Sequence, residues 1–257
     1  MPKLGNRSKM LQHNTGHFGF SAAQMDDLDS SRYTLVTIVV DRSGTTSDFE
    51  RDMEQGLKEI IAACNDEHNP NRFNLLIRVL KFDDRLEEVH GFELVSKIDP
   101  AQYDGSLQAR GGTALYDATI DGVESITEFG KQLIDEDYTV NGLLVVMTDG
   151  LENSSTLAVP GKGGLPDPKN VKASFQQTVK KECLESFLSI LVGVNVADPS
   201  CKAALEAYKD DAGFTQFECL ENADKGSLMK LMDFISRSIS SQSSHLGTGG
   251  PSKPVTF

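Results

Sequence analysis

The chain is 257 residues long and 39% hydrophobic, which is enough apolar material for a single buried core. It carries 25 Lys and Arg residues against 38 Asp and Glu residues, a formal net charge of −13. A surface this acidic repels the phosphate backbone and attracts cations, so we expect no nucleic acid among its partners.

Near-continuous apolar runs alternate with helical patterns along residues 33–240. This alternation is typical of a parallel sheet covered by helices on both faces. The expected strands cover residues 34–40, 73–82, 88–95, 142–148, 187–194 and 214–220. The expected helices cover residues 48–65, 114–134, 170–185, 200–211 and 225–238.

The apolar run at 88–95 directly follows the turn Asp83-Asp84-Arg85. So short a connection leaves no room for a crossover helix, and the strand should therefore pair antiparallel at the edge of the sheet. The predicted fold class is α/β: an open, doubly wound, mostly parallel sheet with one antiparallel edge strand and helices on both faces.

The two ends of the chain differ from this pattern. Residues 1–32 are polar and lack sustained periodicity, and residues 241–257 are rich in Ser, Gly and Pro. Segments of this composition seldom join a core. We therefore expect a mobile N-terminal arm over 1–32, one folded domain over 33–240 and a flexible tail over 241–257.

Oxygen-bearing side chains gather at the ends of two expected strands and at the start of one helix. Asp41 ends the first strand and is followed at alternate positions by Ser43 and Thr45, while Asp149 follows the strand at 142–148. Thr113 follows a glycine pair before the helix at 114–134. Open α/β sheets bind ligands beyond the carboxyl ends of their strands. Because hard divalent cations such as Mg²⁺ take oxygen ligands, these positions predict a metal site.

The pattern DxSxT, then T, then D, resembles the metal-ion-dependent adhesion site (MIDAS) of the von Willebrand factor type A (VWA) domain, usually written DxSxS…T…D. Thr45 replaces the second serine and keeps its hydroxyl. The resemblance covers roughly residues 33–240 and implies a VWA, Rossmann-like fold. It also implies that Ser43, Thr45 and Thr113 give hydroxyl oxygens to Mg²⁺ or Mn²⁺, while Asp41 and Asp149 act directly or through bound waters.

The ligand set implied by this resemblance has a functional consequence. A cation held largely by neutral hydroxyls and waters, with one position open, accepts an acidic oxygen from outside. In the VWA family that ligand is typically an Asp or Glu of a partner protein. The resemblance thus implies a divalent-metal-dependent protein–protein interaction module, and it permits an AAA+ ATPase, a chelatase, or a kinase or phosphatase module as the partner.

Two alternatives stay open. The strand-end motif also resembles the DxDxT of haloacid-dehalogenase-type phosphotransferases, which would make the chain a Mg²⁺-dependent phosphohydrolase. Ser43 occupies the position of the second acid, and a serine cannot act as a general acid near neutral pH, so we expect no enzyme. The other alternative is a homo-oligomeric scaffold, in which Asp26, Asp27 or Asp29 of one copy supplies the carboxylate to the next.

For other polar residues near the expected site, the sequence allows either a functional or a purely structural role. The pair Asp83-Asp84 is best explained as a turn former. Asp117 lies one helical turn after Thr113 on the same face, so it either orients the ligands or takes no part in the site. The segment 151–169 follows Asp149 and is either a rim that selects the partner or a variable surface loop.

The sequence also makes a prediction about location. The N-terminus has no apolar segment of the signal-peptide kind, and no apolar run reaches the roughly 18 residues of a membrane span. The four cysteines show no CxxC pair and no zinc-ligand spacing with histidine, which favours reduced thiols. We therefore expect a soluble, cytoplasmic protein without a membrane partner.

Overall fold

The computed structural model describes residues 10–14, 18–156, 166–244 and 255–257. In these residues an eight-stranded sheet has the order β1-β2-β5-β4-β3-β6-β7-β8. The strands are β1 Leu11–Asn14, β2 Gly19–Ala22, β3 Arg32–Asp41, β4 Leu75–Phe82, β5 Leu86–Leu94, β6 Thr139–Thr148, β7 Ser186–Gly193 and β8 Gln216–Cys219. The α-helices are α1 Glu50–Cys64, α2 Leu115–Asp135, α3 Pro168–Lys180, α4 Pro199–Ala212 and α5 Lys225–Ser244.

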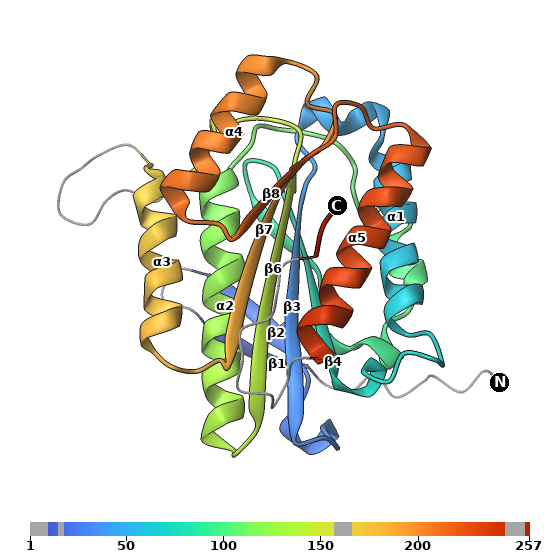
Figure 1. Cartoon of the computed structure of the whole chain (residues 1–257), viewed down its shortest axis with the longest axis vertical. Coiled ribbons are helices and arrows are strands. Elements are labelled where there is room, and N and C mark those ends of the chain that lie inside the picture. The colour runs from blue at the N-terminus through green and yellow to red at the C-terminus, as the bar shows by residue number, and fades with distance from the viewer. Residues whose placement is uncertain (1–9, 15–17, 157–165, 245–254) are drawn as a thin grey trace.

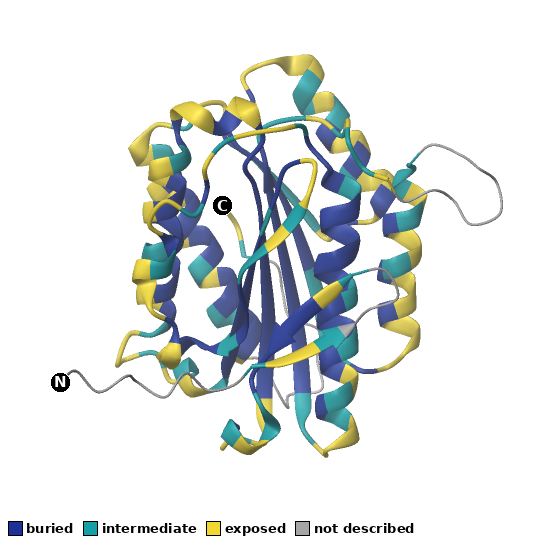
Figure 2. Cartoon of the chain, turned by 180° about the vertical axis from the view of Figure 1, so that it is seen from behind, coloured by how far each residue is buried: buried dark blue, intermediate teal, exposed yellow. Residues whose placement is uncertain are grey.

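Helices cover both faces of the sheet. Figure 1 shows α1 and α5 on one side and α2, α3 and α4 on the other. Along β3, Leu35 and Val39 pack into the core beneath α2, whereas Val36 and Ile38 pack into the core beneath α1 and α5. Because both faces are buried, every residue from Leu35 to Val40 except Thr37 is apolar, which is why this strand reads as a nearly continuous apolar run (Figure 2). The predicted α/β fold class is confirmed.

The sheet extends two strands further beyond β5 than the sequence suggested. β5 pairs antiparallel with β4, as predicted. Beyond β5, however, lie β2, which is parallel to it at Ala22 and Phe92, and then β1, antiparallel to β2. The expected mobile arm therefore contains two strands of the sheet, and Phe20 of β2 is fully buried. Strands of four residues are too short to show a period, so no pattern marked them.

The approach of β2 to β5 depends on one glycine. A Cβ atom at Gly91 would lie 2.0 Å from the carbonyl oxygen of Ser21. No side chain fits there, so Gly91 allows the two backbones to meet. The Ser21 hydroxyl in turn donates to the Glu88 carboxylate at 2.7 Å, which ties β2 to β5 a second time.

Glu88, which is partly buried, belongs to a group of charged residues that reaches into the core. Arg78 of β4 is fully buried, and its Nε donates to Glu88 Oε1 at 2.7 Å. Its Nη2 forms an ion pair of 2.8 Å with Asp121 of α2, which is 1% exposed. Its Nη1 donates to Ser125 Oγ at 3.1 Å. One guanidinium group thus joins β4, β5 and α2 in the middle of the fold.

His90 gives the fold a measurable pH dependence. Burial lowers its pKa to about 4, with the carbonyl of Gly91 and the charge of Glu88 acting in the opposite direction and Arg78 in the same one. Nδ1 lies 2.9 Å from the Gly91 carbonyl and Nε2 lies 2.7 Å from the Tyr103 hydroxyl. A neutral imidazole satisfies both contacts, because Nδ1 donates while Nε2 accepts.

We expect this histidine to destabilise the protein in acid. Its folded pKa lies below the unfolded value of 6.5, so its stabilising contribution is present above pH 6.5 and is lost as the pH falls toward 4. The loss amounts to about 3 kcal/mol. Urea unfolding of wild type and His90→Gln between pH 7.5 and 4 measures it, and the variant should show the flatter profile. Parallel profiles for the two proteins would contradict the assignment.

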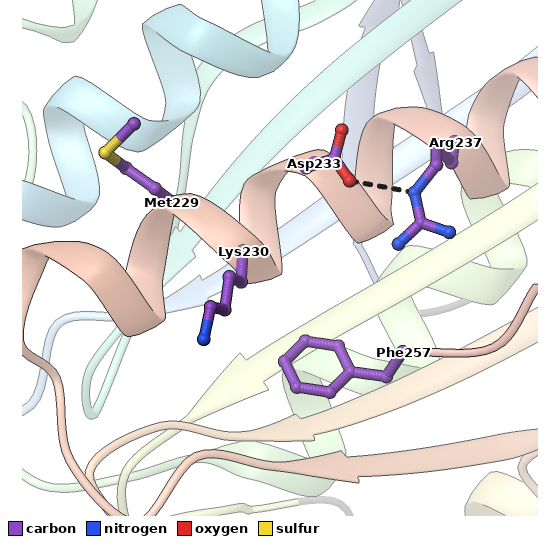
Figure 3. A pocket seen from close by; sticks show the side chains of 5 residues that line it. All are labelled: Met229, Lys230, Asp233, Arg237 and Phe257. Atoms are coloured by element: carbon purple, nitrogen blue, oxygen red, sulfur yellow. Dashed lines mark hydrogen bonds and ion pairs between the residues drawn. The ribbon is translucent and has the colours of Figure 1, made fainter.

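The C-terminal end of the described chain lies beside α5. Val255 accepts a hydrogen bond from Gln216 Nε2 at 2.9 Å, and the Phe257 ring meets Phe234 edge-on at 5.4 Å. Figure 3 shows Phe257 below α5, next to the ion pair of Asp233 with Arg237. These three residues, with Met229 and Lys230, line a cavity of about 360 Å³, and none of them belongs to the expected metal site. None of the described helices combines the length and the apolar character that a membrane span requires. All four cysteines are free thiols.

Candidate metal centre

Strand pairing brings the two predicted acids to one edge of the sheet. β3 and β6 are parallel neighbours, with Val40 opposite Met147. Asp41 ends β3 and Asp149 follows β6, so both lie beyond the carboxyl ends of adjacent strands. The chain leaves β3 toward α1 and leaves β6 toward the 151–156 segment, on opposite faces of the sheet. Open α/β sheets bind ligands beyond the carboxyl ends of strands that diverge in this way.

Asp41 is held from two sides. The backbone N–H of Ser43 donates to its Oδ1 at 2.7 Å, and the hydroxyl of Thr148 donates to its Oδ2 at 2.6 Å. Asp41 is 4% exposed and Ser43 is 3% exposed. The Asp41 carboxylate therefore has one orientation, and it turns the 43–45 loop back over the strand end.

The hydroxyls of that loop converge on Asp149. Thr45 Oγ1 donates to Asp149 Oδ1 at 2.9 Å, and Ser43 Oγ lies 3.5 Å from the same oxygen. The two hydroxyl oxygens are 3.1 Å apart. The structure thus brings three of the predicted ligands within hydrogen-bonding distance of one another, although more than 100 residues separate Asp149 from the other two in the sequence.

Thr113 approaches from a third loop. A Cβ atom at Gly150 would lie 3.9 Å from the Thr113 hydroxyl oxygen. The loop before Thr113 meets the 43–45 loop where Gly44 N donates to Gly111 O at 3.3 Å. Gly111 has a φ of +68°, a conformation that glycine adopts without strain. Within the described residues the Thr113 hydroxyl has no hydrogen-bond partner, so it is available to a ligand.

The two acids of the site are desolvated and lie close together. Burial, together with the smaller effect of the nearby Asp149 charge, raises the pKa of Asp41 to about 6, against hydrogen bonds from Thr148 and Ser43 that oppose the shift. Burial also raises the pKa of Asp149, against hydrogen bonds from Thr45 and Ser43. In the described part of the chain, neither carboxylate has an ion-pair partner. Two crowded, half-desolvated acids without a counter-charge fit a divalent cation.

The donor set also fits the kind of metal. It consists of two carboxylates and three hydroxyls, all oxygen, which suits Mg²⁺ or Mn²⁺. Across residues 10–14, 18–156, 166–244 and 255–257, no three His, Cys, Asp or Glu side chains gather into a group that could hold a metal. A site for a softer metal such as zinc, built on cysteine and histidine, is therefore missing from these residues.

Two supporting residues were not identified from the sequence. Thr148 orients Asp41, as described above. Asp83 does more than form a turn: it accepts from Arg85 N at 2.8 Å, but it is also fully buried and forms ion pairs with Arg42 at 3.0 Å and Arg110 at 2.7 Å. An arginine directly after a strand-end acid was the available signal, because a buried arginine requires a carboxylate nearby.

The remaining expectations have mixed outcomes. Asp117 accepts from the backbone N–H and the hydroxyl of Thr156 at 2.8 and 3.1 Å, so it binds the segment that follows Asp149. Residues 157–165 of the expected rim lie outside the described residues. Asp26, Asp27 and Asp29 precede β3 at the opposite edge of the sheet, where Asp27 lies 3.9 Å from Lys97. Only a second copy could present them to this site.

Comparison with known proteins supports the fold. No protein-family model matches the sequence, and no curated protein matches it. The vWF domain of the type V pili tip protein Mfa5 from Porphyromonas gingivalis is similar to it, with a TM-score of 0.50 and 11% identity over 80% of this chain and 96% of that one. The fold is VWA-like.

Two longer proteins contain the same fold. The PilB minor pilin from Streptococcus sanguinis has a TM-score of 0.59 and 15% identity over 93% of this chain and 68% of that one. The pilus adhesin SpaC from Lactobacillus rhamnosus GG has a TM-score of 0.61 and 9% identity over 94% of this chain and 35% of that one. The VWA-like chain thus spans about two thirds of the pilin and about a third of the adhesin. At these identities the similarity concerns the fold.

Proposed function

We propose that this VWA-like chain is a metal-dependent protein-interaction module. Asp41, Ser43, Thr45, Thr113 and Asp149 would hold Mg²⁺ or Mn²⁺ at the strand ends. The observation that carries the proposal is the convergence of Ser43 and Thr45 on Asp149, beside an Asp41 that is fixed in place. These five residues match the oxygen chemistry of such ions.

The bound cation would supply an open position for a carboxylate oxygen of a partner protein. Three of the five ligands are neutral hydroxyls, so the site retains affinity for one more negative charge. An adhesin and a pilus tip protein are among the chains of the same fold, and this supports an interaction role over a catalytic one. Ser43 supports it too, since it stands where a DxDxT phosphotransferase needs a general acid.

The partner in this proposal is a protein that presents Asp or Glu in the cytoplasm. Four free cysteines support a reducing compartment. A chain with a net charge of −13 repels an acidic partner at long range. The cation therefore has to provide the attraction at short range. Self-association through Asp26, Asp27 or Asp29 of a second copy is the variant in which the partner is the chain itself.

Removing the metal, or one neutral ligand, tests the proposal. We expect affinity capture of the partner to fail in EDTA and to fail with Thr113→Ala, while circular dichroism of the variant matches wild type. A lost hydroxyl contributes about 1 kcal/mol to folding, too little to unfold the domain. Thr178→Ala is the matched control, because it removes a buried threonine hydroxyl from α3 and should leave capture intact.

A partner that stays bound in EDTA and with Thr113→Ala would show that another surface binds it. Analytical ultracentrifugation of the chain alone, with and without Mg²⁺, distinguishes the self-association variant. A metal-dependent dimer would identify a second copy as the partner. A monomer in both conditions would mean that the binding partner is a different protein.

A further inference from the structure

The N-terminus of α2 is capped from elsewhere in the chain. Its N-cap residue, Ala114, has no side chain that can accept a hydrogen bond. Instead, Tyr116 N donates to Glu152 Oε2 at 3.0 Å and Asp117 N donates to Ser155 Oγ at 3.1 Å. The free N–H groups at the start of a helix need such acceptors, and here the segment 152–156 provides them.

The Thr113 hydroxyl takes no part in capping α2. A threonine at the N-cap position often accepts from the first turn with its own hydroxyl, but here the N-cap is Ala114 and Thr113 precedes it. Because the segment 152–156 satisfies those N–H groups, the Thr113 hydroxyl stays unused within the described residues. It also means that an incoming carboxylate finds these amides already occupied, and the cation becomes its main attraction.

Asn153 binds the backbone of Thr113 on both sides of its Cα atom. The N–H of Thr113 donates to Asn153 Oδ1 at 2.8 Å, and the carbonyl of Thr113 accepts from Asn153 N at 3.0 Å. Ser154 N donates to the same carbonyl at 3.2 Å. A residue gripped at both its N–H and its C=O has little freedom to rotate, so Asn153 determines where the Thr113 side chain lies.

Residues on both sides stabilise the contact between Thr113 and the segment 152–156. A Cβ atom at Gly112 would lie 2.7 Å from Asn153 Oδ1 and 2.2 Å from Ser154 Oγ, so any larger residue would displace these two side chains. On the other side, Glu152 Oε1 accepts from Ser154 N at 2.8 Å and from Ser155 N at 2.6 Å, which folds the segment into a compact turn. The segment is therefore preformed against Thr113.

We propose that Asn153 is a positioning residue of the candidate metal centre, which sets the Thr113 hydroxyl opposite Asp149. This inference rests on the proposed function. Asp149 and Asn153 are four residues apart on one stretch of chain, so this stretch supplies one ligand and places another that is distant in sequence. Residues that orient metal ligands typically change metal affinity about 10-fold to 100-fold when replaced.

Mn²⁺ titration of the full chain by water-proton relaxation tests the role. We expect Asn153→Ala to bind Mn²⁺ about 10-fold more weakly than wild type. The matched control is Asn69→Ala at the opposite edge of the sheet. The Asn153 side chain accepts from Thr113 N and from Ser154 Oγ. The Asn69 side chain likewise makes two hydrogen bonds: it accepts from Asn71 N and donates to the Cys64 carbonyl. The control should lose similar stability and keep wild-type affinity for Mn²⁺.

Amide hydrogen exchange of the metal-free protein gives an independent readout. Asn153→Ala should speed exchange of the Thr113 amide roughly fivefold, because that N–H loses its acceptor. Asn153→Asp keeps a side-chain oxygen in the same place and should restore slow exchange. Asn69→Ala should leave the Thr113 amide unchanged.

The other outcomes distinguish a failure of the positioning role from a failure of the proposed function. Wild-type Mn²⁺ affinity in Asn153→Ala, or an equal loss in Asn69→Ala, would overturn the positioning role and leave the proposed function standing. If wild type itself binds no Mn²⁺, the proposed function is refuted, and the positioning role falls with it.

Discussion

Asp41→Asn is expected to abolish Mn²⁺ binding and yet to raise the melting temperature of the metal-free protein. The buried Asp41 carboxyl has a pKa of about 6, above its ordinary value of 3.8. The protonated form is therefore favoured by folding, and the stability that it contributes is lost as the pH rises through about 6. Above that pH the ionised carboxylate costs up to about 3 kcal/mol, which a neutral amide avoids.

Added metal should reverse this difference, so that wild type has the higher melting temperature and Asp41→Asn the lower. At 100 times its dissociation constant, a cation that binds only the folded state stabilises it by about 2.7 kcal/mol. For a chain of this size we expect wild type to gain roughly 5 to 10 °C at pH 7.5, and Asp41→Asn to gain nothing. Thermal unfolding with and without Mn²⁺ measures both effects, and Asp149→Ala should likewise abolish the gain.

Asp48→Asn is the control for lost charge, because Asp48 is an exposed acid in the 3₁₀ turn that follows Ser43. It should retain the metal-dependent gain. A gain of wild-type size in both Asp41→Asn and Asp149→Ala would mean that the cation binds elsewhere, and the site assignment would be wrong.

Arg78→Leu is expected to destabilise the fold by about 3 to 5 kcal/mol. Arg78 is fully buried and faces the carboxylates of Asp121 and Glu88. Removing only the guanidinium leaves the Asp121 carboxyl buried and unpaired, and burial already raises the pKa of that group. Glu88 would also lose the partner that holds it in place for Ser21, so the β1–β2 hairpin should loosen.

The double variant Arg78→Leu with Asp121→Asn distinguishes an unpaired charge from a poorly filled space. An amide tolerates burial better than a carboxylate, so we expect the second change to recover part of the loss. Urea unfolding of wild type, both single variants and the double variant measures the coupling. Strictly additive losses would show that packing around residue 78, and not the buried charge, stabilises this region.

The sequence by itself determined the central sheet and the identity of the candidate ligands. Continuous apolar runs mark strands buried on both faces, and an acid at the end of such a run lies at the sheet edge whatever the neighbours are. Asp41, Ser43 and Thr45 could be read from one short stretch for that reason. Thr113 and Asp149 also stand at element boundaries, and these boundaries follow from local periodicity.

The tertiary structure alone decided which segments meet and what supports the ligands. β1 and β2 are too short to show a period, so only the contact at Gly91 and Ser21 reveals their place in the sheet. Asn153 contacts Thr113 across 40 positions, and Arg78 contacts Ser125 across 47. Such contacts depend on strand order and on how closely two backbones approach. Neither leaves a pattern within a single stretch of sequence, because both are properties of the packed elements together.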